Sequence, residues 1–228
     1  MAGMLTVPAR PITGCALALP AVLLQHRAMK RSHARPGEVR IIGGEWRGRR
    51  LPVPAGPAVR PTGDRVRETL FNWLAPVIGG MRGLDLFAGT GALGLEALSR
   101  GAAAMCFVER DRAAARAIEE SLHRLDCDRA RVVAGDALQF LAGAPRAFDL
   151  VFLDPPFGEV AVGDLCKLLD GGWLSGNARI YLELPRAGSL PELPQGWRLL
   201  REKTAGHVRF ALASGPLAHE QHAGDAGS

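Results

Sequence analysis

The sequence of 228 residues has few cysteines, and nothing brings them together. Cys15, Cys106, Cys127 and Cys166 are scattered, with no Cys-x-x-Cys pair and no histidine at ligand spacing. This pattern excludes a disulfide framework and a zinc site, so we expect no metal. Such cysteine usage is typical of proteins from the reducing cytoplasm. Internal repeats are also absent, which excludes solenoid architectures.

A hydrophobic run long enough to span a membrane is missing too. Residues 12–24 are apolar apart from Thr13, but Pro20 interrupts them and the run is too short for a transmembrane helix. Only Arg10 precedes the run with positive charge, which does not fit an export signal. We therefore expect a cytoplasmic protein with no membrane partner. Met29, where a polar and basic stretch begins, is an alternative start of translation.

Positive charge is present in excess, and it is concentrated in one segment. The formal net charge is +5, yet residues 27–67 hold eleven Lys or Arg against three acids, so the rest of the chain is acidic. A basic segment beside a nearly neutral domain indicates contact with phosphates, as in nucleic-acid binding. The alternative is a solvated basic arm without a partner.

From residue 83 onward, short apolar runs alternate with helical patterns. This order predicts an α/β fold with a doubly wound, mostly parallel sheet that ends in an antiparallel hairpin. We expect sheet strands at 84–88, 104–109, 131–135, 149–154, 179–184, 197–202 and 207–213. Helices are expected at 64–74, 92–99, 112–125, 138–141 and 160–169.

The basic segment has its own predicted structure. Two short strands at 39–42 and 49–53 flank a glycine-containing turn, which predicts a small β-hairpin. The chain then divides into a flexible N-terminal extension (1–38), a basic β-hairpin appendage (39–60), the α/β domain (61–215) and a flexible tail (216–228).

A glycine motif follows the first predicted strand of the sheet and opens a helix. Gly89, Gly91 and Gly94 form the G-x-G-x-x-G spacing that lets a backbone approach a nucleotide-like ligand, and Glu109 stands where ribose hydroxyls would bind. Asp85, just before the glycines, would repel a pyrophosphate but can accept hydrogen bonds from an ammonium group. The motif therefore favours S-adenosylmethionine over a nicotinamide dinucleotide.

Two further acids follow predicted strands. Asp136 comes after the third strand, where it could reach an adenine amino group or cap the next helix. Asp154 begins the tetrapeptide Asp154-Pro155-Pro156-Phe157 after the fourth strand. Its carboxylate, rigid backbone and aromatic ring suit a flat base that carries an amino group. The alternative is a turn with Phe157 in the core. Parallel strands end at one edge, so we expect these acids to lie together there.

Together these motifs resemble the class I S-adenosylmethionine-dependent amino-methyltransferases. More narrowly, residues 40–52 (RIIGGEWRGRRLP), 60–74 (RPTGDRVRETLFNWL) and 84–100 (LDLFAGTGALGLEALSR) resemble the RsmD family, which methylates N2 of guanine 966 in bacterial 16S ribosomal RNA. The resemblance covers residues 29–213. It implies a Rossmann-like, seven-stranded methyltransferase domain that acts, we expect as a monomer, on 16S RNA in the small ribosomal subunit or its assembly intermediate.

The resemblance also implies roles for particular residues. Asp154 and the Pro155 carbonyl would accept hydrogen bonds from the guanine amine, and Phe157 would stack the base. The expected catalytic residues are Asp154, Pro155, Pro156 and Phe157. The expected cofactor-binding residues are Asp85, Phe87, Gly89, Gly91, Glu109, Arg110, Asp136 and Ala137. The expected RNA-binding residues are Arg40, Trp46, Arg47, Arg49, Arg50, Arg60, Arg65 and Arg67, of which Trp46 could stack on RNA or pack inside.

Three other functions fit parts of the sequence. A DNA amino-methyltransferase would use the same tetrapeptide, but no target-recognition domain is recognisable. A nicotinamide dehydrogenase is disfavoured by Asp85 and by the lack of a second catalytic domain. A non-catalytic RNA-binding or assembly factor would not need the intact glycine motif and the acids that follow the strands.

Overall fold

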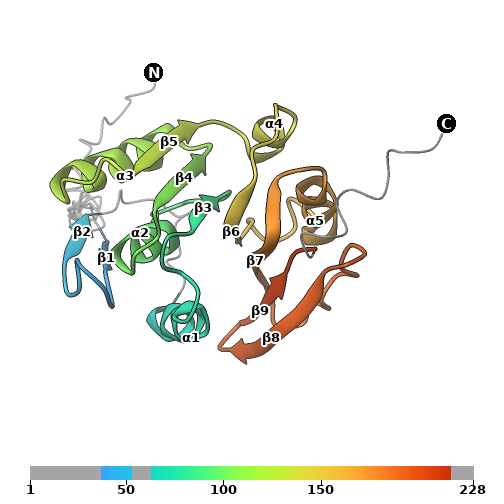
Figure 1. The fold of residues 1–228 in the computed structure, drawn as a ribbon. Helices are drawn as coiled ribbons and strands as arrows, with labels where there is room; N and C mark the ends of the chain where they lie inside the picture. The colour runs from blue at the N-terminus through green and yellow to red at the C-terminus, as the bar shows by residue number, and fades with distance from the viewer. Residues whose placement is uncertain (1–36, 53–62, 217–228) are drawn as a thin grey trace, which may run out of the picture. The chain divides into compact units, whose positions relative to one another are not determined.

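A seven-stranded sheet forms the framework of the protein, in the order β5-β4-β3-β6-β7-β9-β8 (Figure 1). The computed structural model describes residues 37–52 and 63–216. The strands β3, β4, β5, β6 and β7 are parallel, and β9 and β8 close the sheet as an antiparallel pair. The strands are β3 (Arg82–Asp85), β4 (Ala104–Glu109), β5 (Ala130–Ala134), β6 (Phe148–Leu153), β7 (Leu174–Pro185), β8 (Arg198–Ala205) and β9 (Val208–Ser214). The predicted α/β fold is confirmed.

The order of the strands reverses once, and this reversal determines where a ligand can bind. From β3 the chain adds β4 and β5 on one side, and it then returns to add β6 and β7 on the other. The connecting helices cross the sheet on different faces in the two halves, and open α/β sheets bind their ligands at such a reversal, here between the carboxyl ends of β3 and β6.

Helices cover both faces of the sheet and enclose two apolar clusters. Helices α1 (Asp64–Leu74), α2 (Ala92–Ser99) and α3 (Arg112–Arg124) contribute Phe71, Leu95 and Ile118 to one cluster. Helices α4 (Ala137–Leu141) and α5 (Val162–Asp170) contribute Leu141 and Leu165 to the other. Every residue of α2 is buried, which fits a helix that is apolar on nearly all sides.

Three strands of the sheet differ clearly from their expected bounds. Strand β3 covers Arg82–Asp85, so it starts two residues earlier and ends three residues earlier than the expected 84–88. Strand β7 begins at Leu174, five residues before the expected start, because Leu174 pairs with Phe148 ahead of a register shift. The terminal hairpin is confirmed, but its turn is the two residues between Ala205 and Val208. Gly206 has a φ of +57°, which this tight turn requires, so Lys203–Ala205 stay in the strand.

The predicted basic hairpin is present, with shorter strands than expected. Strands β1 (Glu38–Arg40) and β2 (Arg50–Pro52) pair antiparallel, and residues 41–49 form the connecting loop. The strands end early because the backbone of Ile42 and Gly43 binds α2 instead of continuing the ladder. The expected N-terminal extension to residue 36, Arg60 and the tail from residue 217 lie outside the described residues.

Candidate active site

The acids that the sequence places after its strands lie at one edge of the sheet, on both sides of the reversal. Asp85 is the last residue of β3, and Asp154 directly follows β6 on the neighbouring strand. Glu109 ends β4, and Asp136 follows β5. Open α/β sheets bind their ligands in the crevice at this edge.

Asp85 is buried beneath the glycine loop. Its side chain is 2% exposed, and Oδ2 accepts a hydrogen bond of 3.1 Å from the backbone N–H of Gly94. Burial raises the pKa of Asp85 to about 7, the Gly94 bond opposes this, and the charges of Asp154 and Glu109 add to it. Near neutral pH a cationic group placed beside Asp85 would therefore stabilise the carboxylate strongly.

The glycine loop is tied to Glu109 on the next strand. Gly89 and Gly91 have φ values of +52° and +74°, which are accessible to glycine at little cost. The N–H of Gly89 donates to Oε2 of Glu109 at 2.7 Å, and Oε1 accepts from the N–H of Asp111 at 2.8 Å. A Cβ at Gly89 would come no closer to another atom than 4.0 Å, to the carbonyl of Phe87, so the turn faces open space.

Asp136 has the structural role that the sequence left as an alternative. Its Oδ1 accepts hydrogen bonds from the N–H groups of Leu138 and Gln139 at 2.9 and 3.0 Å, so it caps α4. The cap is confirmed, and contact with a cofactor stays a prediction. Ala137 is the buried first residue of α4, and Phe87 is half-buried.

Arg110, expected to contact the cofactor, is paired with Glu159 from the loop that follows the Asp-Pro-Pro-Phe tetrapeptide. Two hydrogen bonds of 2.5 and 2.9 Å join the guanidinium to the carboxylate. This pairing lowers the pKa of Glu159 and raises that of Arg110. Both side chains are exposed, so the pair adds little stability, but it connects the ends of β4 and β6 at the edge where the acids lie.

The tetrapeptide presents its aromatic ring to solvent. Asp154 is half-buried, Pro155 is buried and Pro156 is exposed. Phe157 is 52% exposed, so the alternative that placed it in the core is wrong. An exposed ring beside a carboxylate and a rigid Pro-Pro backbone leaves a flat surface on which a base could stack.

The structure adds an acid at this edge that the sequence analysis did not identify. Glu183 of β7 is 5% exposed, and its Oε2 accepts a 2.5 Å hydrogen bond from the hydroxyl of Tyr181. Burial, with a smaller contribution from the charge of Asp154, raises the pKa of Glu183 to about 7 against the opposing effect of the Tyr181 hydrogen bond. A lone acid in the apolar run Ile-Tyr-Leu-Glu-Leu was the available sequence signal.

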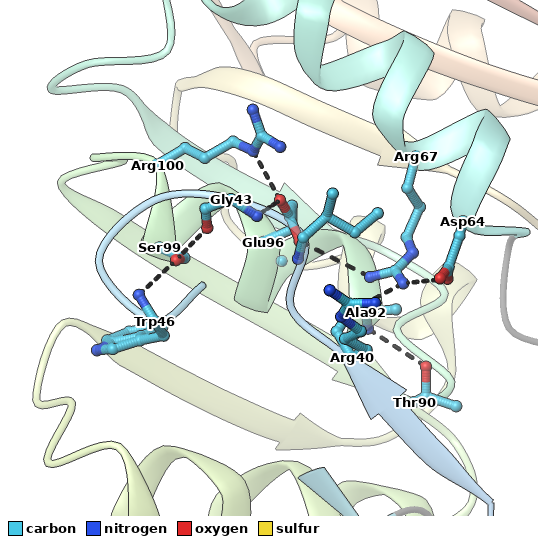
Figure 2. A network of polar contacts seen from close by, with 12 residues as sticks. Arg40, Gly43, Trp46, Asp64, Arg67, Thr90, Ala92, Glu96, Ser99 and Arg100 are labelled. Atoms are coloured by element: carbon cyan, nitrogen blue, oxygen red, sulfur yellow. Dashed lines mark hydrogen bonds and ion pairs between the residues drawn. The ribbon is translucent and has the colours of Figure 1, made fainter. Parts of the chain in front are cut away.

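The basic hairpin is held on α2 by one buried carboxylate (Figure 2). Glu96 is fully buried and accepts hydrogen bonds from the N–H groups of Ile42 and Gly43 at 2.7 and 2.8 Å. It also accepts a 2.7 Å bond from Nε of Arg100. Ser99 Oγ donates to the Gly43 carbonyl at 2.6 Å and accepts from the Trp46 N–H at 2.9 Å. Glu96 is the only acid in an otherwise apolar helical pattern, a signal that the sequence analysis passed over.

Two of the expected RNA contacts are internal. Arg67 is 1% exposed, and its Nη2 donates to Asp64 Oδ1 at 2.7 Å and to the Arg40 carbonyl at 2.9 Å. Its Nη1 lies 3.8 Å from Glu96 Oε2, so the expectation that Arg67 contacts RNA is wrong. Trp46 is 6% exposed and lies under the guanidinium of Arg129. Of the two roles expected for it, stacking on RNA or packing inside, the structure shows packing inside.

The remaining described arginines of the expected interface are exposed. Arg40 lies on β1, Arg50 lies on β2 and pairs with Glu38, and Arg65 lies on α1; Arg47 and Arg49 belong to the loop of the hairpin. Val39, beside Arg40, packs against Ala92, the residue that follows Gly91 of the glycine loop. The hairpin therefore lies next to the candidate cofactor site.

Within residues 37–52 and 63–216, no helix is both long and apolar enough to cross a membrane.

Comparison with known proteins identifies the family. A family model described as "conserved hypothetical protein 95" matches residues 39–214. The Escherichia coli K12 protein named ribosomal RNA small subunit methyltransferase D is 51% identical over 184 residues, which cover 80% of this chain and 93% of the relative. The protein of the same name from Haemophilus influenzae is 47% identical over 184 residues, which cover 77% and 93%.

Solved structures agree with the sequence comparison. A structure from Escherichia coli, 48% identical, matches with a TM-score of 0.75 and covers 80% of this chain and 99% of that one. A Haemophilus influenzae structure, 44% identical, matches with a TM-score of 0.68 over 79% and 99% of the two chains. The chain therefore belongs to the RsmD family of methyltransferases.

Proposed function

We propose that this chain transfers a methyl group from S-adenosylmethionine to the exocyclic N2 of one guanine, number 966 by family resemblance, in the 16S RNA of the small ribosomal subunit. The observation that carries this proposal is the position of Asp154-Pro-Pro-Phe157 beside Asp85 at the reversal of the sheet. The relatives named for methylation of small-subunit ribosomal RNA support the class of substrate.

The acceptors at the sheet edge fit S-adenosylmethionine. This cofactor brings an ammonium group, ribose hydroxyls and an adenine amine, all of them donors, and when bound it supplies an electrophilic methyl on a sulfonium. Asp85 would hold the ammonium, Glu109 the ribose hydroxyls and Asp136 the adenine amine. The open space at Gly89 suits a close approach of the cofactor, and a ring of acids is unsuited to a pyrophosphate.

Asp154 and Pro155 would prepare the amine for attack. The lone pair of guanine N2 is delocalised into the ring, which makes the nitrogen a poor nucleophile. Hydrogen bonds from the amine to the Asp154 carboxylate and the Pro155 carbonyl favour a pyramidal nitrogen whose lone pair points at the methyl. Positive charge then develops on this nitrogen, and the Asp154 carboxylate stabilises it. Phe157, exposed beside them, would stack the flipped base.

The exposed arginines of the hairpin would bind the RNA backbone near the site. Arg40 extends the strand whose Val39 touches the first residue of α2, so phosphates bound there would lie close to the glycine loop. Arg47, Arg49, Arg50 and Arg65 would add further phosphate contacts. Arg60 belongs to the proposed interface by resemblance. The Glu96 network would hold the hairpin in one orientation for this task.

We further infer that the protein works as a monomer in the cytoplasm. Three of its cysteines, Cys106, Cys127 and Cys166, are free thiols in the part of the chain that the structure describes. This state is compatible with a reducing compartment.

The decisive experiment is transfer of labelled methyl from S-adenosylmethionine to three substrates: unmodified small ribosomal subunits, naked 16S RNA and duplex DNA. Nuclease digestion and chromatography then identify the methylated nucleoside. We expect N2-methylguanine in the ribosomal substrate. Label in DNA alone would favour the DNA methyltransferase, and cofactor binding without transfer to any substrate would favour the non-catalytic factor.

Variants of Asp154 test the assignment of the catalytic residue. Asp154→Asn should lower kcat by about 10²–10⁴-fold, because the amide can neither stabilise the positive nitrogen nor accept its proton. Calorimetric binding of the cofactor should persist within a few-fold. Asp164→Asn, at an exposed acid on α5, is the matched control and should keep full activity. Wild-type turnover by Asp154→Asn would overturn the mechanism.

Salt dependence tests the RNA interface. Replacing Arg47 and Arg49 by Ala together should reduce the slope of log K against log salt by about 0.7 for each phosphate that the protein no longer neutralises. Replacing Arg116 and Arg124, which are exposed on α3, is the matched control and should leave the slope unchanged. A salt slope of the Arg47 and Arg49 double variant equal to that of the wild-type protein would show that these two hairpin arginines do not bind phosphates.

A further inference from the structure

Three acidic side chains follow one another across three neighbouring strands at the candidate active site. Asp85 ends β3, Asp154 follows β6, and Glu183 lies near the end of β7. In the parallel pairing of β6 with β7, Leu153 is opposite Leu182. Asp154 is the residue after Leu153, just past the end of β6, and Glu183 is the residue after Leu182 on β7, so the two acids follow this last pair at neighbouring positions.

The residues two positions before Asp154 and Glu183 form one row on a face of the sheet. Phe152 and Tyr181 are opposite each other in the pairing and belong to the same buried cluster. Side chains two residues apart on a strand point to the same face. Glu183 lies two residues beyond this pair on β7, so it extends the row toward the edge, where Asp154 follows β6 close enough for its charge to act on Glu183.

Glu183 is built into this position by its neighbours. Tyr181 donates its hydroxyl hydrogen to Oε2 of Glu183 at 2.5 Å, and both side chains are buried. Burial, followed by the charge of Glu183, raises the pKa of Tyr181 well above its ordinary value, so the phenol keeps its proton and remains a donor. The carboxylate is thereby held in one orientation at the catalytic edge.

Within residues 37–52 and 63–216, the strands paired beside Glu183 place no cation directly next to it. On β9 the opposite residue is Phe210, on which Trp73 of α1 stacks. On β8 the residue opposite Phe210 is the exposed Lys203, one strand further away. The charged groups that face Glu183 from its surroundings are therefore Asp154 of the neighbouring strand, then Asp85 beyond it, and Lys203 at the periphery.

We propose that Glu183 is a positioning residue that acts through Asp154: its buried negative charge makes Asp154 basic enough to take the proton that leaves the methylated amine. The inference rests on the proposed methyl transfer to an exocyclic amine, and it deepens that proposal by assigning the fate of the proton. Electrostatic coupling is mutual, so the charge of Asp154, which disfavours ionisation of Glu183, implies an equal effect of Glu183 on Asp154.

The atoms balance as follows. The lone pair of guanine N2 forms the new N–C bond, and the methyl–sulfur bond breaks with its electron pair left on sulfur as a neutral thioether. The nitrogen then carries a positive charge and two hydrogens, and one of these leaves as a proton to a carboxylate oxygen of Asp154. The neutral Asp154 releases this proton to water before the next turnover.

The test begins with a titration that needs neither cofactor nor RNA. Carboxyl NMR of the full chain with ¹³C-labelled glutamate follows Glu183, whose signal is assigned by its loss in Glu183→Gln. In Asp154→Asn the midpoint of Glu183 should move to lower pH by about 0.5–1 pH unit, because the neighbouring charge is gone. Tyr181→Phe should move it to higher pH, because the hydrogen bond of the phenol favours the ionised carboxylate. Asp164→Asn, at an exposed aspartate of α5, should leave the midpoint unchanged.

Kinetics then connect the titration to the reaction. Glu183→Gln should lower kcat about tenfold with little change in KM for RNA, and the acidic limb of its kcat–pH profile should move to lower pH. A Glu183 midpoint that is unchanged in both Asp154→Asn and Tyr181→Phe would overturn the proposal, as would a moved midpoint together with unaltered kcat and pH profile in Glu183→Gln. If wild-type protein forms no N2-methylguanine, the proposed function itself fails, and the titration still reports whether Glu183 and Asp154 are coupled.

Discussion

Removing the carboxylate of Glu96 should destabilise the protein far more than removing an exposed one. Glu96→Ala leaves the N–H groups of Ile42 and Gly43 without their acceptor and Arg67, 1% exposed, without a buried counter-ion. Breaking a buried ion pair from one side costs about 3–5 kcal/mol, and each buried donor without an acceptor costs about 1–3 kcal/mol. Because the site can relax and admit water, we expect a loss of about 3–5 kcal/mol in the free energy of unfolding.

Urea unfolding followed by tryptophan fluorescence measures this loss, with Glu120→Ala, an exposed site on α3, as the matched control. The control should change the free energy by less than about 0.5 kcal/mol. Glu96→Gln should lie between the two, because its amide oxygen can still accept one backbone hydrogen bond. Hydrogen exchange should also show reduced protection at the amides of Ile42 and Gly43. A loss below about 1 kcal/mol in Glu96→Ala would refute the role given to this carboxylate.

Three further predictions concern single residues. Asp85→Asn should raise the free energy of unfolding at pH 8 by about 2–4 kcal/mol and weaken cofactor binding. The pKa of Asp85 is raised from 3.8 to about 7, so the wild type loses stability between these pH values, and urea unfolding at pH 5 should show a smaller difference. Gly44→Ala should lower the free energy of unfolding by more than about 3 kcal/mol, because its Cβ would lie 1.8 Å from the last carbonyl oxygen of α2. In the same assay Gly48→Ala, also at positive φ but with open space around it, should lower it by about 1–2 kcal/mol. A thiol reagent with peptide mapping should label Cys127 before Cys166, whose pKa burial raises to about 12; the reverse order would contradict the burial of Cys166.

The sheet and the acids at its edge could be predicted from the sequence because both depend on local patterns. Each parallel strand is a short apolar run, and all such strands end at one edge, so Asp85, Glu109, Asp136 and Asp154 could be placed together from their sequence positions alone. The exposure of Phe157 could not be predicted in this way, because a Pro-Pro turn is compatible with a ring on either side.

Local sequence patterns could not predict which charged side chains are buried. Arg67 lies three and four residues before Leu70 and Phe71, on the buried side of α1, but its partner Glu96 is 29 positions away. A count of positive charge therefore assigned Arg67 to the RNA surface. Glu183 was missed for a related reason. Its position beside Asp154 depends on the register of β7 against β6, which tertiary pairing fixes.

Because the basic hairpin is attached to α2, its arginines would not keep their arrangement if the hairpin were moved to another protein. Each strand of the hairpin has 3 residues, which is too few to keep a two-stranded ribbon folded in water by itself. Its loop takes its shape from α2, a helix that begins at the glycine loop and ends at Ser99, which binds Gly43 and Trp46. A peptide cut from this region and fused to another enzyme would carry the charge but lose the arrangement. Under the proposed RNA-binding role, changes in the α2 residues that hold the hairpin should therefore alter RNA selectivity as much as changes in the arginines themselves.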